Sequence, residues 1–201
     1  MGQYYNAVIN VNGNKEVFYH QVDGKYMMAK LMEHGYWANP FVLAVASKLW
    51  RTKGQLAWVG DYAENGDFNW HDDFADAHNS DVVKNDLEYN GFRLEGKYFI
   101  NHSKKLIIDC DRYKSLLEEK KIDMIVSPVP LLTAVGNDKD GGDFRRGVGK
   151  DLVGTWAWDI VEITDQPVYD WEYNGSDWDK KLKTEFADYE EVTDEYLFIE
   201  D

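Results

Sequence analysis

The sequence predicts an α+β fold in which β-hairpins build an antiparallel or mixed sheet and about three helices pack on it. First, β-rich runs occur in neighbouring pairs that are separated by short turns. Second, apolar residues recur at three- and four-residue spacing in separate segments, which indicates amphipathic helices. Because these strands and helices do not alternate strictly, the pattern disfavours a doubly wound parallel sheet.

Local signals predict the elements in order. Residues 3–10 and 15–20 are β-rich, and Asn12-Gly13 between them is typical of a type I′ turn. Pro40 suits the first turn of a helix, and Asp111 is a candidate N-cap of a later one. The other expected elements are a helix from residue 27, a helix over 40–50, strands at 55–59, 91–94, 98–102 and 106–109, a helix over 111–121, and strands at 122–126 and 154–163.

Two further predictions concern the prolines and tryptophans in the second half of the chain. Pro128 and Pro130 are expected to force extended geometry on the residues around them. Alternation over residues 154–163 predicts a strand with Trp156, Trp158 and Ile160 on one face.

Charge is distributed unevenly along the 201 residues. The chain has 22 basic and 37 acidic residues, a net charge of −15. Residues 170–201 contain 12 acidic and 3 basic residues, so −9 of this charge lies there and −6 in the first 169 residues. We therefore predict a compact domain at 1–168 and an acidic, aromatic C-terminal segment at 169–201. Such a charge repels phosphate backbones, so direct nucleic-acid binding is disfavoured.

The sequence also predicts where the protein resides. No stretch approaches the roughly 20 apolar residues that a membrane helix needs. The N-terminal residues lack the basic and apolar regions of a signal peptide. Cys110 is the only cysteine, which excludes an intrachain disulfide and a cysteine-rich zinc site. We expect a cytoplasmic protein without a membrane partner.

A cluster of aspartate and histidine residues is the candidate metal site. Imidazole nitrogens with carboxylate oxygens suit zinc, manganese or iron. The alternatives are a solvated polar loop and, over residues 61–72, an imperfect calcium loop. The proposed ligands are Asp61, His71, Asp73 and His78.

A glycine-rich loop over residues 136–150 is the candidate ligand site. Glycines allow close backbone approach, and successive N–H groups with nearby basic side chains form an anion nest. The loop lacks the order of a phosphate-binding loop, and a surface loop between strands is the alternative. The candidate ligand-binding residues are Gly136, Asn137, Gly141, Gly142, Asp143, Arg145, Arg146, Trp156 and Trp158.

Aromatic residues alternate with carboxylates in the C-terminal segment. Rings that fill pockets and carboxylates that steer approach suit a partner with a basic surface. The alternative is a segment that packs its rings on the domain and leaves its acids in water. The candidate partner-binding residues are Trp171, Tyr173, Trp178 and Tyr189.

Several motifs resemble an uncharacterised family of small proteins of gut bacteria and of their phages or mobile elements. The motifs are MGQYY (1–5), WVGDYA (58–63), NHSKK (101–105) and GTWAWD (154–159), and the resemblance spans about residues 1–163. It implies a bacterial or phage context. No activity is known for the family, so the resemblance assigns no catalytic residue.

Three functions are consistent with the sequence, and the last of them is a purely structural subunit of a larger assembly. The first is a non-enzymatic binding protein, such as an acidic inhibitor or anti-defence factor, that acts on a protein partner or sequesters a small ligand. The second is a metal-assisted hydrolase or nucleotide-handling enzyme that uses the Asp61–Asp81 cluster and the Gly136–Gly149 loop. The sequence identifies no cofactor for any of these functions.

Overall fold

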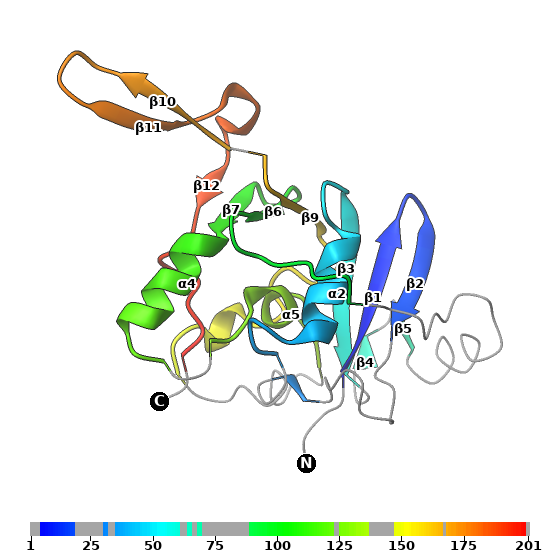
Figure 1. The fold of residues 1–201 in the computed structure, drawn as a ribbon. Coiled ribbons are helices and arrows are strands. Elements are labelled where there is room, and N and C mark those ends of the chain that lie inside the picture. Colours follow the sequence, from blue (N-terminus) through cyan, green and yellow to red (C-terminus); the bar gives the residue numbers. More distant parts are fainter. Residues whose placement is uncertain are drawn as a thin grey trace.

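A mostly antiparallel β-sheet with helices packed on it organises the molecule (Figure 1). The computed structural model describes residues 5–18, 30–31, 35–60, 64–65, 68–69, 89–122, 125–136, 147–166 and 168–199. The main elements are β1 (Tyr5–Val11), β2 (Asn14–Phe18), α2 (Pro40–Lys48), β3 (Gly54–Gly60), β6 (Tyr98–Asn101), β7 (Leu106–Asp109), α4 (Cys110–Glu119), α5 (Pro128–Leu132), β8 (Ala134–Val135), β9 (Ile160–Thr164), β10 (Tyr169–Tyr173), β11 (Trp178–Leu182) and β12 (Glu190–Glu191). Shorter elements are β4 (Glu64–Asn65), β5 (Phe68–Asn69) and the 3-10 turns η1 (Lys150–Leu152) and η2 (Thr184–Phe186).

The predicted α+β class is confirmed. Within the described residues, eight strands form one sheet in the order β12-β7-β6-β9-β3-β1-β2, with β8 beside β3. The pairings of β12 with β7 and of β8 with β3 are parallel, and the other pairings of this sheet are antiparallel. None of the helices in the described ranges has the length and apolar character that a membrane crossing requires.

Two local signals gave correct predictions near the N-terminus. Asn12 and Gly13 have φ angles of 53° and 82°, so the β1–β2 hairpin has the type I′ turn that Asn-Gly favours. Pro40 is the first residue of α2, as predicted, and Asn39 before it caps the helix, because its side-chain oxygen accepts hydrogen bonds from the backbone N–H groups of Phe41 and Val42. The helix expected from residue 27 lies largely outside the described residues.

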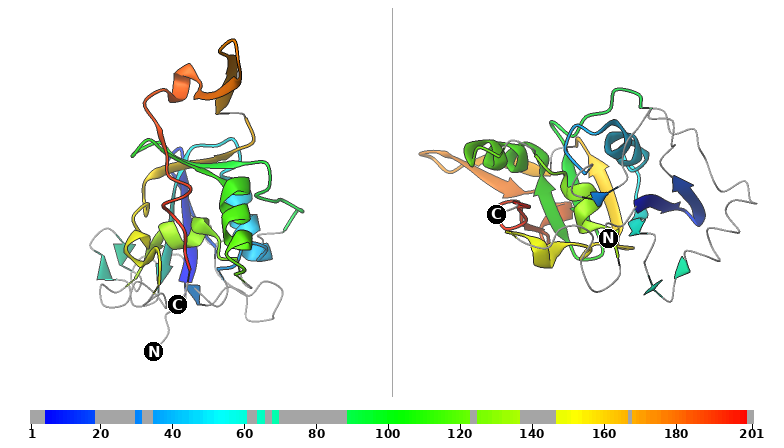
Figure 2. Two further views of the ribbon diagram at one scale, coloured as in Figure 1. Left: turned by 90° about the vertical axis from the view of Figure 1, so that its left-hand side faces the viewer. Right: turned by 90° about the horizontal axis from the view of Figure 1, so that it is seen from below.

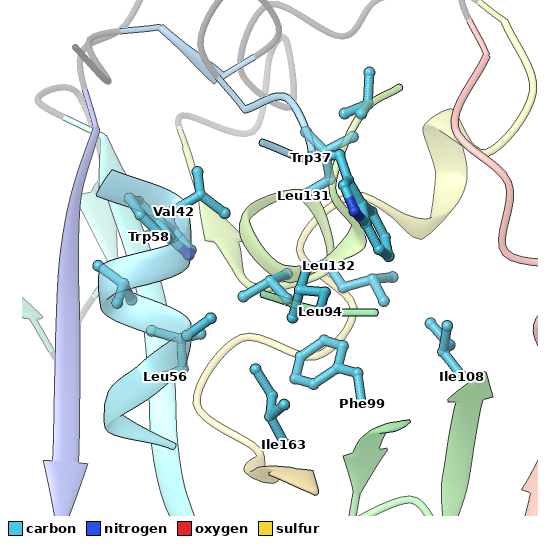
Figure 3. Close-up of a cluster of buried hydrophobic side chains, with 14 of the residues drawn as sticks. Trp37, Val42, Leu56, Trp58, Leu94, Phe99, Ile108, Leu131, Leu132 and Ile163 are labelled. Atoms are coloured by element: carbon cyan, nitrogen blue, oxygen red, sulfur yellow. The ribbon is translucent and has the colours of Figure 1, made fainter. Parts of the chain in front are cut away.

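The main core lies between one face of the sheet and the helices. Alternation along β3 places Leu56 and Trp58 in this core, whereas Ala57 and Val59 face the opposite side. Val42 from α2 and Leu131 and Leu132 from α5 also belong to the main core, and Figure 3 shows these side chains together. On the opposite face, a smaller cluster forms around Ile100, Ile107 and Val168.

Two predictions about helix beginnings were wrong. Asp109, not Asp111, caps α4, and its carboxylate accepts from the N–H groups of residues 111 and 112. Cys110 is therefore the first residue of α4. Pro128 and Pro130 lie inside α5 rather than in extended chain. The first turn of a helix has free N–H positions, so prolines fit there once Ser127 supplies the cap.

Three predicted strands also differ from the structure. Residues 91–94 form no strand. In the segment 122–126, Val126 forms one isolated β-bridge with Tyr36, and residues 123–124 lie outside the described ranges. The predicted strand over 154–163 begins only at Ile160, because the preceding residues form successive turns against α5. Gly154 is required there, since a Cβ atom would lie 2.4 Å from the carbonyl oxygen of Ala134.

The C-terminal segment has two parts with different surroundings. Residues 183–199 lie against the body: β12 pairs with β7, and the Phe198 side chain is fully buried in the main core. The β10–β11 hairpin projects away from the sheet in all three views (Figures 1 and 2). One part of the predicted segment therefore docks and the other extends into solvent.

Candidate functional site

The residues of the predicted metal site lie outside the described part of the chain. They are Asp61, His71, Asp73 and His78. Within the described residues, no group of three or more His, Cys, Asp or Glu side chains is arranged to hold a metal ion. The metal site stays a prediction from the sequence.

The glycine-rich loop is described only at its two ends. Gly136 is half-buried and directly follows β8. At the other end, a Cβ atom on Gly149 would lie 2.2 Å from the carbonyl oxygen of Leu197, so the loop returns to the body against the C-terminal segment. The candidate ligand-binding residues of the loop that lie outside the described ranges are Asn137, Gly141, Gly142, Asp143, Arg145 and Arg146.

The two tryptophans that were expected to contact a ligand do not share a face. Trp156 is fully buried, with its ring centroid 4.9 Å from that of Phe99, so solvent does not reach it. Trp158 is half-buried and packs on the opposite side of the sheet, against the cluster that contains Val59. Its φ angle of 64° is unusual for a bulky residue, and this left-handed conformation interrupts the predicted alternation.

The NHSKK and GTWAWD motifs contact each other. The side-chain nitrogen of the buried Asn101 donates to Asp159 over 2.8 Å, and Lys104 forms an ion pair with the same carboxylate at 2.9 Å. Ser103 Oγ accepts a hydrogen bond from the backbone N–H of Ile160. These contacts fasten the β6–β7 turn to the start of β9, which gives both motifs a structural role.

A hydrogen-bonded network around His102 was missed by sequence reasoning. Its Nε2 lies 2.9 Å from a Glu162 carboxylate oxygen, and its Nδ1 lies 2.9 Å from the Tyr189 hydroxyl. The side chains of His102 and Glu162 are only 10% and 16% exposed. His102 is separated from its partners by 60 and 87 residues, so no local pattern indicates the network.

The single cysteine has no chemical role in the described part of the chain. Burial raises the pKa of the Cys110 thiol, which leaves that sulfur protonated and inert.

The projecting hairpin carries the largest exposed rings of the described chain. The side chains of Trp171, Tyr173 and Trp178 are 62%, 59% and 61% exposed. Tyr173 and Trp178 lie directly opposite each other, with ring centroids 5.3 Å apart. In the loop between the strands Gly175 has a φ of 96°, and the Asn174 side-chain oxygen accepts hydrogen bonds from the backbone N–H groups of Ser176 and Asp177.

All the rings of the hairpin lie on one face, because they belong to the non-hydrogen-bonded residue pairs, which alternate with the hydrogen-bonded pairs. Asn174 N donates to Asp177 O over 3.0 Å, and Lys183 N donates to Val168 O over 2.9 Å. Between these hydrogen-bonded pairs, every second pair is non-hydrogen-bonded, and its side chains approach most closely. The pairs that form this face, which we call the aromatic face, are Tyr169–Leu182, Trp171–Lys180 and Tyr173–Trp178.

The base of the aromatic face is anchored to the body. The Tyr169 ring packs edge-on against Tyr98, with centroids 5.9 Å apart, and its hydroxyl donates to Glu191. Lys180 Nζ lies 3.7 Å from the Tyr169 ring centroid and 3.6 Å from the Glu191 carboxylate. Burial, and then the Glu191 carboxylate, raise the pKa of Tyr169. The base is thus fixed by a ring, a cation and a carboxylate.

Carboxylates flank both exposed tryptophans in sequence. Trp171 lies between Asp170 and Glu172, and Trp178 lies between Asp177 and Asp179. Within each strand these neighbours point away from the aromatic face, because successive side chains alternate. Lys181 forms an ion pair with Glu172 at 3.3 Å. The hairpin therefore combines an aromatic face with an acidic one.

Tyr189 differs from the other candidate partner-binding residues. It is half-buried, its hydroxyl is bonded to His102, and its ring packs against Phe186 with centroids 5.2 Å apart. Its contacts are therefore internal, whereas the three residues at the hairpin tip are exposed.

Comparison with protein-family models, with curated proteins and with solved structures finds no match to this chain.

Proposed function

We propose that the protein is a cytoplasmic, non-enzymatic binding protein whose hairpin tip docks on a protein partner with a basic surface. The observation that supports this function most directly is the cluster of Trp171, Tyr173 and Trp178 on one face of a projecting hairpin. At their measured exposure, these rings present roughly 350 Å² of apolar surface. A patch of this size is comparable with the largest on a typical monomer and is often functional.

The shape of the hairpin also favours docking. A two-stranded hairpin without further strands is only marginally stable in water. This one is held at its base, where Tyr169 and Leu182 pack against the body, while its tip lies free of the sheet. Large rings at such a tip lose water when a partner covers them, and aromatic side chains are enriched among the residues that contribute most binding energy.

Charge indicates the kind of partner. The net charge of −15 attracts a basic surface over a long range and repels phosphate backbones. An acidic inhibitor or anti-defence factor is the concrete form of this proposal, in keeping with the bacterial or phage context that the sequence motifs imply. The enzyme hypothesis depends chiefly on residues outside the described ranges, and no contact among the described residues favours it.

The test uses the full-length protein and three substitutions. Proteins captured from a bacterial lysate are identified, purified and titrated with wild type and with Trp171→Ser/Tyr173→Ser/Trp178→Ser. We expect the triple variant to bind at least about tenfold more weakly, since these are the anchoring rings. Trp50→Ser is the matched control, because Trp50 is 45% exposed on the body of the protein. Equal affinity of wild type and triple variant for every purified partner would overturn the proposal.

A further inference from the structure

The hairpin base already contains a complete binding arrangement for a cationic side chain. The ammonium group of Lys180 lies 3.7 Å from the Tyr169 ring centroid, within the range of a strong cation–π contact. The Glu191 carboxylate lies 3.6 Å from the same nitrogen. Ring and carboxylate therefore hold one cation between them, on the same face of the hairpin as the exposed rings.

The tip presents further rings on the same face of the hairpin as Tyr169, but without a cation over them. Among the described residues, no Lys or Arg lies over the rings of Trp171, Tyr173 or Trp178, whereas Tyr169 has its lysine. Carboxylates adjoin both tryptophans in sequence, and those within the strands point to the opposite face of the hairpin, so they act on a bound cation only over a longer range. Indole is the most favourable ring for a cation, so the tip offers stronger ring surfaces than the base.

We propose that the tip of the hairpin recognises cationic side chains, arginine ahead of lysine, on an exposed segment of the partner. Each cation stacks on an exposed ring, and the carboxylates on the opposite face of the hairpin add a long-range attraction. Arginine is preferred because its planar guanidinium is weakly hydrated and stacks on aromatic faces, whereas an ammonium group keeps its water more firmly. This inference rests on the proposed function and specifies the chemistry of the partner.

Charge argues against a second copy of this chain as the occupant. Two copies would each contribute a net charge of −15, and each hairpin carries Asp170, Glu172, Asp177 and Asp179 close to the contact. A basic segment reverses the sign of that interaction.

The test titrates the full-length protein, by calorimetry at physiological ionic strength, with three eight-residue peptides. Glycine alternates with arginine in the first, with lysine in the second and with citrulline in the third. Citrulline keeps the planar shape of arginine without its charge. We expect the arginine peptide to bind about two- to fivefold more tightly than the lysine peptide, and the citrulline peptide to show no binding. Equal affinity for the arginine and lysine peptides would overturn the inference.

A charge-matched variant separates ring recognition from general electrostatic attraction. Trp171→Leu/Tyr173→Leu/Trp178→Leu keeps the apolar tip and the net charge but removes the rings. We expect it to lose about five- to tenfold in affinity for the arginine peptide and to lose the preference over lysine. Trp50→Leu is the control and keeps the wild-type affinities. Wild-type affinity in the triple leucine variant would also overturn the inference.

The outcomes distinguish this inference from the proposed function. If a purified partner binds through the hairpin but the arginine preference is absent, the inference fails and the proposed function stands. If the serine variant binds the partner as wild type does, the proposed function fails. A concentration-dependent dimer that the leucine substitutions abolish, measured by light scattering, would replace the basic partner with a second copy and overturn the inference.

Discussion

The Tyr189 hydroxyl lies 2.9 Å from Nδ1 of His102, and this hydrogen bond fastens the C-terminal segment to the turn between β6 and β7. The other ring nitrogen of His102 contacts Glu162 in β9. A single imidazole therefore connects three parts of the chain, close to the base of the projecting hairpin.

A double-mutant cycle tests this connection. Tyr189→Phe removes one hydrogen bond and is expected to lower the free energy of unfolding by about 0.5–1.5 kcal/mol. His102→Ala is expected to cost about 2–3 kcal/mol, because Glu162 also loses its partner in a largely buried position. The coupling energy between the two substitutions, measured by urea unfolding, is expected to be about 1 kcal/mol. Strictly additive changes in the free energy of unfolding would contradict a direct interaction. Tyr173→Phe, at the exposed tip, is the control.

Substitutions of Trp158 test its left-handed backbone. Trp158→Ala and Trp158→Gly remove the same ring contacts, but only glycine adopts a φ of 64° without steric cost. We expect the glycine variant to be more stable than the alanine variant by about 1 kcal/mol in chemical unfolding. At Ser115, exposed in α4, the order is expected to reverse, with glycine about 1 kcal/mol less stable than alanine. The same order at both sites would exclude backbone strain as the cause.

Buried phenol and thiol groups predict a loss of stability at alkaline pH. Burial raises the pKa values of Cys110, Tyr98, Tyr113, Tyr169 and Tyr189 above their ordinary values of 9.0 and 10.0. Because the unfolded chain ionises first, their contribution is complete below about pH 9 and is lost as the pH rises through the folded-state pKa values. The free energy of unfolding, measured by urea at pH 7.5 and pH 10.5, is expected to be smaller at the higher pH.

Tyr113→Phe provides the comparison for the alkaline prediction. Tyr113 is fully buried, and phenylalanine removes its ionisable hydroxyl while keeping the ring. We expect the variant to lose less stability than wild type between the same two pH values. An identical loss in both proteins would show that the Tyr113 phenol makes no contribution.

Shortening the hairpin and removing the whole C-terminal segment are expected to have different effects. Asn-Gly in place of residues 171–180 joins the opposed pair Asp170 and Lys181 by a two-residue turn. It keeps Tyr169 and Leu182 at the hairpin base and removes the surface contacts of Lys180. Its melting temperature is expected to stay within a few degrees of wild type, as for other surface changes. Deleting residues 170–201 also removes β12 and the buried Phe198, so we expect no cooperative melting.

Phe198→Ala measures the contribution of the docked part alone. Its ring is fully buried in the main core, and such a truncation costs about 3–5 kcal/mol. A melting temperature equal to that of wild type would contradict the assignment of residues 183–199 to the body of the protein.

Local signals predicted most elements, and they failed where contacts distant in sequence decide the structure. Asn12-Gly13 and Pro40 act through their own backbone geometry, so the sequence is sufficient to place the first turn and the start of α2. Trp156 and Trp158 alternate like strand residues but lie in turns, because the segment packs against α5 and Gly154 approaches Ala134 closely. No local pattern reports such an approach.

The sequence predicted the candidate residues of the site but not which of them are exposed. Trp171, Tyr173 and Trp178 were identified by composition, since rings among carboxylates are unusual on a surface. The same composition also selected Tyr189, whose hydroxyl and ring have internal partners. What separates these residues is the hairpin itself: β10 and β11 pair only with each other in the described chain, so their tip has no layer to cover it.

The free edges of the hairpin have a further consequence for the behaviour of many copies in a crowded solution. Bare strand edges are templates on which other chains add strands and build aggregates. Asp170 and Glu172 on β10 and Asp179 on β11 place negative charge beside these edges. Hairpins of two copies that met edge to edge would bring like charges together, which disfavours stacking. The same carboxylates that suit a basic partner thus keep the molecules apart from one another.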